Sequence, residues 1–112
     1  MGPDDGTIAP WVVVASLPFA PEIVIPTARN LAGLHLGGMD RPYGFRCSFN
    51  QTFRVDDNPT GWWVTPNQFG IDQGPVVLMV ENYRTGLIWN LIRRCPPVVA
   101  GLRRAGFTGG WL

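Results

Sequence analysis

The sequence contains no lysine, a single histidine and only two cysteines. Nine arginines face eight carboxylates, so the formal net charge is +1 and no excess field attracts nucleic acid or an anionic membrane. His35 cannot form a zinc site with only two distant cysteines, Cys47 and Cys95. We therefore expect a neutral partner, no metal, no cofactor and free thiols.

The sequence also lacks long apolar runs and a targeting segment. The apolar stretch Trp11–Ala15 is far too short to span a bilayer. Residues 1–6 have neither a basic n-region nor an apolar h-region. We therefore expect no membrane span, and we expect the intact parent protein to be periplasmic or secreted, with its export signal upstream of this chain.

What the sequence does contain is aromatic bulk, in a chain long enough for one core. Five Trp, six Phe and two Tyr among 112 residues argue against disorder, despite 14 Gly and 11 Pro. Residues 2–18 are predicted to be loops around a short β-branched run, and the first predicted helix lies within Phe19–Leu36. Because proline inside a helix clashes with the carbonyl four residues back, we place the start of the regular helix near Pro26.

Two more helices follow in the second half of the chain. The stronger runs from Asp72 to about Arg94, because Asp72 can cap it and apolar residues follow at helical spacing. Gly86 is a weak point within it. The last helix, Pro96–Arg104, begins at a proline pair and is ended by Gly106. The predicted fold class is all-α, with long aromatic loops.

Residues 37–69 are punctuated by glycine and proline and are predicted to be mostly loop, with at most short strands at Tyr43–Phe49 and Trp62–Val64. A loop of this length in a compact domain is usually a binding loop or a lid. Seven aromatic rings lie in it: Tyr43, Phe45, Phe49, Phe53, Trp62, Trp63 and Phe69. The Trp62-Trp63 pair can serve as core as readily as a binding platform.

Carboxylates among aromatic rings are typical of sugar sites, where rings stack on pyranose faces and two acids flank the scissile bond. Asp72 and Glu81 lie nine residues apart, which puts them on opposite helix faces and about 13 Å apart along the axis. At most one of them therefore faces a given pocket. Helix capping is the alternative role for Asp72, and a local ion pair with Arg84 is the alternative for Glu81.

One match goes beyond these generic patterns. Several segments, in the expected order, closely resemble the C-terminal signature of the glucoamylase-like domain, which includes bacterial endo-β-1,2-glucanases and a domain of cyclic β-1,2-glucan synthases. The segments are Asp5–Pro10, Ser16–Glu22, Tyr43–Phe45, Gly70–Pro75, Glu81–Gly86 and Arg103–Phe107. They extend over nearly the full chain.

The resemblance implies the C-terminal part of an (α/α)₆ barrel, with a sugar groove where the inner helices begin and hydrolysis by general acid and base with inversion. It implies that Asp72 is catalytic, whereas Glu81 and Arg84 remain structural. The residues implied to line the groove are Asp5, Thr7, Tyr43, Phe45, Trp62 and Trp63. One departure is that Cys47 stands where the family usually has the acid of an Asp-Ala-Phe-Asn sequence.

We therefore expect part of a glycoside hydrolase that acts on β-glucan, β-1,2-glucan being the candidate linkage. The general acid would lie on earlier helices, so the isolated chain would be inactive. The alternative is a non-catalytic, carbohydrate-binding or self-associating remnant of that domain. Single-stranded nucleic acid could also stack on the rings, but the near-zero net charge disfavours it.

Overall fold

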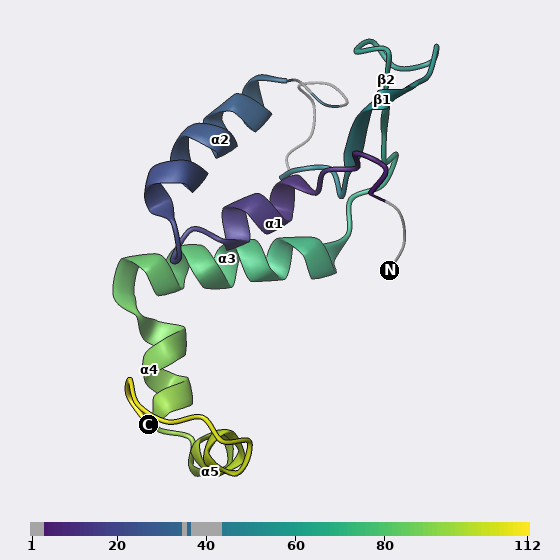
Figure 1. The fold of residues 1–112 in the computed structure, drawn as a ribbon. Coiled ribbons are helices and arrows are strands. Elements are labelled where there is room, and N and C mark those ends of the chain that lie inside the picture. Colours follow the sequence, from purple (N-terminus) through teal and green to yellow (C-terminus); the bar gives the residue numbers. More distant parts are fainter. Residues whose placement is uncertain (1–3, 35, 37–43) are drawn as a thin grey trace.

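The computed structural model describes residues 4–34, 36 and 44–112, and in them the chain is rich in helix with one small sheet (Figure 1). The helix-rich character agrees with the predicted class, whereas the two-stranded sheet departs from a purely helical fold. The elements are α1 (Pro10–Ala15), α2 (Pro21–Gly33), β1 (Phe49–Arg54), β2 (Trp62–Val64), α3 (Gly70–Thr85), α4 (Leu87–Arg93) and α5 (Pro96–Arg104).

Helix α1 is the centre of the packing, because it contacts both α2 and α3. Figure 1 shows α1 lying between these two helices, with the sheet beyond one end of α3 and with α4 and α5 extending away from the other end. Among the described elements, α4 contacts only α3 and α5. The first half of the chain therefore packs on α3, while the C-terminal helices continue from it as an arm.

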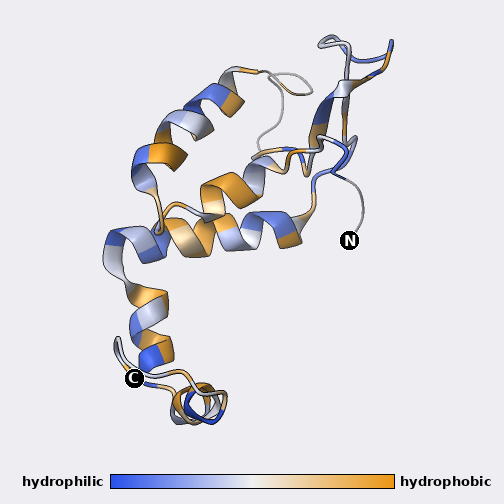
Figure 2. Cartoon of the chain, in the orientation of Figure 1, coloured by the Kyte–Doolittle hydropathy of each residue, from blue (hydrophilic) through white to orange (hydrophobic). Residues whose placement is uncertain are grey.

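The arrangement is open. The chain exposes 8017 Å², whereas a compact monomer of this mass exposes about 6,100 Å². Its radius of gyration is 17.6 Å, against about 13 Å for a compact domain of this length. The buried apolar side chains among the described residues are Val24, Leu31 and Phe49. Figure 2 shows apolar stretches along α1, α3 and α4, and many of these residues face solvent.

Helix α1 was not predicted, because its valine run favours strands over helices. Pro10 occupies the first helical position, where its missing N–H costs nothing. The helix is short, and isolated helices of this length are unstable in water. Its packing on α2 and α3 therefore stabilises it.

Helix α2 begins earlier than predicted, and the expected start near Pro26 is wrong. Pro21 occupies the first turn, and Pro26 lies inside the helix on an exposed face. The carbonyl of Glu22 thereby loses its helical partner, and exposure lets water replace it. At the next residue, the hydroxyl of Thr27 donates to the carbonyl oxygen of Ile23 at 2.7 Å.

The predicted long helix is two helices joined at Gly86. Gly86 has a φ of 69°, and its N–H donates to the carbonyl oxygen of Asn82 at 2.8 Å. The buried side chain of Asn82 accepts the N–H of Trp89 at 3.1 Å, which fixes the start of α4. Helix α3 begins at Gly70 with no side-chain cap, so the prediction that Asp72 caps it is wrong. Helix α5 has its predicted bounds.

The sheet pairs β1 and β2 antiparallel, with Phe49 opposite Val64 and Asn50 opposite Trp63, and with an irregularity before Arg54. β2 lies where the sequence predicted a strand, but β1 follows the predicted segment Tyr43–Phe49 and shares only Phe49 with it. Ile8 bridges to Phe49 on the other side. The sheet therefore holds the N-terminal segment and the loop before α3 together.

In the ranges that the structure describes, no helix is both long enough and apolar enough to cross a membrane.

Candidate functional site

Asp72 is the third residue of α3, and only 6% of its surface is exposed. Its Oδ2 atom has no hydrogen-bond partner among the described residues. The first turn of a helix favours a negative charge, but burying a carboxylate oxygen without a partner costs free energy. Since Asp72 does not cap the helix, capping does not explain its burial. Asp72 is therefore a candidate functional carboxylate.

The thiol of Cys47 lies against Asp72 and Trp11. Burial raises the pKa of Cys47 above its usual value of 9.0, and hydrogen bonding with the Asp72 side chain and its negative charge raise this pKa further. Hydrogen bonds with the side chains of Ser48 and Trp11 lower the pKa of Cys47 and only partly offset that rise. Cys47 is therefore a neutral thiol near pH 7, and it contributes no second negative charge beside Asp72.

Two glutamines hold the loop of Phe45 and Cys47 against the start of α3. The side-chain amide of Gln68 donates to the carbonyl oxygen of Gly44 at 2.6 Å, and that of Gln73 donates to the carbonyl oxygen of Phe45 at 3.1 Å. Gly44 has a φ of 89°, and a Cβ there would collide with the Gln73 side chain. This close approach puts Phe45 beside the turn that carries Asp72.

The N-terminal residues Asp5 and Thr7 are held at the sheet by Asn50, which is 5% exposed. The amide nitrogen of Asn50 donates to the backbone oxygen of Asp5 at 2.8 Å and to the hydroxyl of Thr7 at 3.2 Å. The Asp5 side chain is exposed, and hydrogen bonds from the Thr7 side chain and backbone lower the pKa of Asp5. Asp5 is thus a solvated anion at neutral pH.

The predicted site residues fall into two groups. The backbone of Phe45 is bonded to Gln73, the residue after Asp72, at the start of α3, while Asp5 and Thr7 are bonded to the sheet, where Trp63 pairs with Asn50. Trp62 and Trp63 are half-buried on β2. The segment from Cys47 to Asn50 joins the two groups. Within it, the Ser48 hydroxyl is hydrogen-bonded to the Thr65 hydroxyl, which follows β2, at 2.8 Å. Tyr43 lies outside the described residues.

Three residues near these groups were missed by sequence reasoning: Trp11, Arg46 and Asn50. Trp11 belongs to an apolar run that gave no sign of a polar role. Arg46 is 6% exposed, and its Nε and Nη1 atoms have no partner among the described residues. Asn50 matches the last residue of the family's Asp-Ala-Phe-Asn sequence, and this match was the signal by which the sequence could have identified it.

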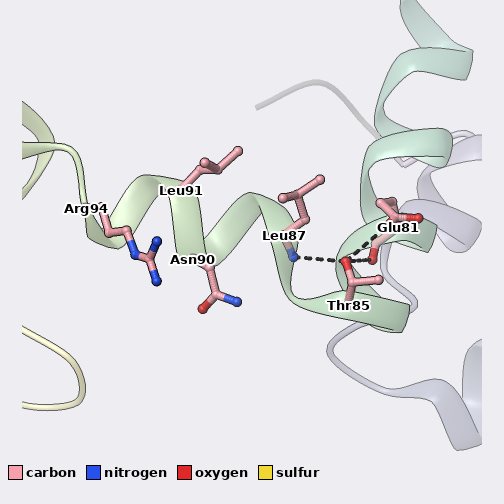
Figure 3. Close-up of a pocket in the computed structure, with 6 residues that line it drawn as sticks. All are labelled: Glu81, Thr85, Leu87, Asn90, Leu91 and Arg94. Atoms are coloured by element: carbon pink, nitrogen blue, oxygen red, sulfur yellow. Dashed lines mark hydrogen bonds between the residues drawn. The ribbon is translucent and has the colours of Figure 1, made fainter.

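Glu81 lies away from Asp72, at the elbow between α3 and α4. It pairs with Arg84 at 3.9 Å, as predicted, and accepts the hydroxyl of Thr85 at 2.9 Å. Figure 3 shows the hollow at this elbow, which has a volume of about 420 Å³. Its lining residues are Glu81, Thr85, Leu87, Asn90, Leu91 and Arg94. Asp72 and Glu81 therefore do not line one pocket there.

The described part of the chain contains no group of three His, Cys, Asp or Glu side chains that could hold a metal ion. Cys47 and Cys95 are free thiols, as predicted.

The Glycoamylase family model matches residues 1–96. The chain belongs to this glucoamylase-like family. Gly70–Pro75, one of the segments that resemble the family signature, forms the first turns of α3 and contains Asp72.

Solved structures and a curated relative from this family are similar to the chain. The endo-β-1,2-glucanase of Chitinophaga pinensis, solved with sophorotriose and glucose, is 34% identical with a TM-score of 0.72, over 96% of this chain and 24% of that one. The β-1,2-glucanase of Parabacteroides distasonis is 40% identical with a TM-score of 0.68, over 89% of this chain and 13% of that one.

The curated relative is an exo β-1,2-glucooligosaccharide sophorohydrolase (non-reducing end) from Parabacteroides distasonis, 39% identical over 101 residues. That alignment covers 90% of this chain and 13% of the relative. The chain thus spans a quarter or less of the length of each of these glucoamylase-like proteins.

Proposed function

We propose that the chain is part of a glycoside hydrolase that acts on β-glucan, with β-1,2-glucan as its substrate. The observation that carries this proposal is the buried carboxylate of Asp72, which has an unpartnered oxygen at the start of α3. The activities of the three relatives, all directed at β-1,2-linked glucose, support the substrate class. Their similarity covers nearly all of this chain.

In this proposal Asp72 is one of the two carboxylates that act as general acid and base. Inverting hydrolysis needs a second carboxyl group about 6.5 to 9.5 Å away, across the scissile bond. Glu81 lies at the far elbow of α3, and Asp5 is a solvated anion beside the sheet. The general acid therefore comes from another part of an (α/α)₆ barrel, and the 112-residue chain alone is inactive.

The aromatic side chains give the proposed groove its sugar-binding surface. The loop of Phe45 is held to Gln73, next to Asp72, and Trp62 and Trp63 stand half-buried on β2, where a ring face can stack on a pyranose. Asp5 and Thr7 lie at the same sheet and supply polar contacts. Tyr43 is assigned to this groove from the family resemblance alone.

A hybrid enzyme tests this function. In it, this chain replaces the matching C-terminal quarter of the Chitinophaga pinensis endo-β-1,2-glucanase. We expect the hybrid to release sophorooligosaccharides from β-1,2-glucan, while the truncated glucanase without this chain does not. A folded hybrid with no activity on β-1,2-glucan would contradict the proposal.

The second candidate is the non-catalytic remnant, and the open surface of the chain favours it. The chain exposes about 1,900 Å² more than a compact monomer of its mass, and large apolar side chains such as Ile71 and Val77 are 81% and 67% exposed. Sedimentation equilibrium distinguishes this candidate. A concentration-dependent dimer that binds sugar without cleaving it in any hybrid would favour the remnant over the hydrolase.

A further inference from the structure

The first turns of α1 and α3 contain two buried polar atoms that bond to no nitrogen or oxygen atom of the described residues. Trp11 is the second residue of α1, Asp72 is the third residue of α3, and the two helices pack together. These atoms are the indole Nε1 of Trp11 and the Oδ2 of Asp72, and the Cys47 thiol is the hydrogen-bonding group beside them. Buried polar atoms in proteins almost always bond to protein, water or ligand, so these atoms point to a bound group.

Cys47 brings the two atoms into one site, because its side chain lies against both Trp11 and Asp72. The loop that carries Cys47 is held to α3 by Gln73, the residue after Asp72. A thiol is a weak donor and a weak acceptor. The Cys47 thiol therefore gives Nε1 of Trp11 and Oδ2 of Asp72 only weak hydrogen bonds, and a stronger partner could replace it.

The two atoms have complementary roles. An indole N–H only donates, and an ionised carboxylate only accepts. An anionic ligand would be repelled by Asp72, and an ammonium group could not accept from Trp11. A hydroxyl group fits both, since it accepts one hydrogen bond and donates another.

We propose that Trp11 and Asp72, with Cys47 against both, bind one hydroxyl group of a sugar ligand. The Trp11 N–H donates to the hydroxyl oxygen, and the hydroxyl donates to Oδ2 of Asp72. The identity of the ligand as a sugar rests on the proposed function. The site adds Trp11, which sequence reasoning treated as part of an apolar run, to the substrate-binding residues.

The first test is the affinity of the 112-residue chain for sophorotriose, measured by NMR titration. Trp11→Phe keeps an aromatic ring and removes the N–H, and we expect it to weaken binding roughly three- to tenfold, as loss of one hydrogen bond does. Trp111→Phe is the matched control, because Trp111 stacks on Arg93 at the distant C-terminal end. This control should bind as the parent does, and circular dichroism checks that both variants fold.

The second test needs no substitution at Trp11, so it holds even if Trp11→Phe fails to fold. In a Cys95→Ser chain, Cys47 is the only thiol, and its rate of alkylation by iodoacetamide reports on access to the site. Saturating sophorotriose should slow this alkylation, whereas maltotriose at the same concentration should not.

The outcomes separate the two proposals. If sophorotriose binds, but Trp11→Phe matches Trp111→Phe and alkylation is unchanged, the hydroxyl site is wrong while the proposed function stands. A water molecule held between Trp11 and Asp72 in place of the sugar hydroxyl would give this result. If the chain binds no sophorotriose, the hydroxyl site is also wrong, and cleavage by the hybrid glucanase decides the proposed function separately.

Discussion

At the residue scale, Asn50 fastens together segments that lie more than 40 positions apart. Its amide nitrogen holds the backbone of Asp5 and the hydroxyl of Thr7, while its oxygen accepts the N–H groups of Thr52 and Phe53 at 2.8 and 3.1 Å. In the sequence it is one asparagine in a loop region with many aromatic residues. Only the fold reveals that its side chain is almost fully buried.

We expect Asn50→Ala to lower the free energy of unfolding by about 1 to 3 kcal/mol, because it removes the hydrogen bonds of a buried side chain to Asp5, Thr7, Thr52 and Phe53. Urea unfolding followed by circular dichroism measures this loss. Asn30→Ala is the control, since Asn30 is exposed on α2 and should change the unfolding free energy by no more than about 0.5 kcal/mol. Equal effects of the two substitutions would contradict the anchoring role of Asn50.

Cys47 gives the chain a pH dependence of known sign. Its pKa in the folded chain is raised above 9.0, its usual value and the one expected when unfolded. The folded state therefore binds this proton more tightly, so the stabilisation is complete below pH 9.0 and is lost as pH rises through the folded pKa. We expect the free energy of unfolding to fall between pH 8 and pH 10.5, and to fall less in Cys47→Ala.

The control for this prediction is Cys95→Ala, which removes the other thiol of the chain and should keep the parent's pH dependence. Urea midpoints at the two pH values measure it. If Cys47→Ala and Cys95→Ala lose stability equally with pH, the pKa shift of Cys47 does not contribute to stability.

At the scale of elements, proline and glycine marked α5 correctly but misplaced the start of α2, and tertiary packing explains why α1 was missed. Helix α5 was predicted residue for residue, because Pro96 begins it and Gly106 follows its end with a φ of 85°. The start of α2 was misplaced because Pro26 tolerates an exposed helical position. Helix α1 was missed because its stability comes from α2 and α3 rather than from its own residues.

The candidate site was predictable only in part, for the same reason. The family segments singled out Asp72 and Phe45, and the backbone of Phe45 is bonded to Gln73, the residue after Asp72. The burial of Asp72 and its contact with Cys47 arise from the packing of α1 and the loop after residue 44, which no local pattern encodes. Trp11 and Arg46 were missed because hydrogen-bond satisfaction is a property of the fold.

Gly86 sets the direction of the C-terminal arm, and its substitution tests the elbow. We expect Gly86→Ala to lower the free energy of unfolding by about 1 to 2 kcal/mol, because alanine resists a φ of 69° and its Cβ would lie 3.3 Å from the Asn90 side chain. Thermal unfolding followed by circular dichroism measures the loss.

The matched control is Gly101→Ala, which lies inside α5 with open space around a new Cβ. Alanine suits a helix better than glycine, so this variant should gain about 0.5 to 1 kcal/mol. Should Gly86→Ala stabilise the chain as much as Gly101→Ala does, the elbow does not require a left-handed residue.

At the scale of the whole molecule, the chain is open and corresponds to a small part of its relatives. The chain measures 53 × 33 × 26 Å and buries few apolar side chains. It matches 13 to 24% of the length of the glucanases and the sophorohydrolase compared above. Within the proposed barrel, the exposed apolar faces of α3 and α4 pack against other helices, and Asp72 lies at the end of α3 where the groove opens.

The most direct measurement is the turnover of β-1,2-glucan by the hybrid glucanase, with Asp72→Asn compared against Glu81→Gln. Both substitutions neutralise one carboxylate of α3 and preserve its shape, so they differ only in where the charge is lost. A catalytic Asp72 predicts that Asp72→Asn lowers kcat by about 10² to 10⁴-fold, while Glu81→Gln stays close to the parent. Equal turnover by the two folded variants would show that Asp72 takes no part in hydrolysis.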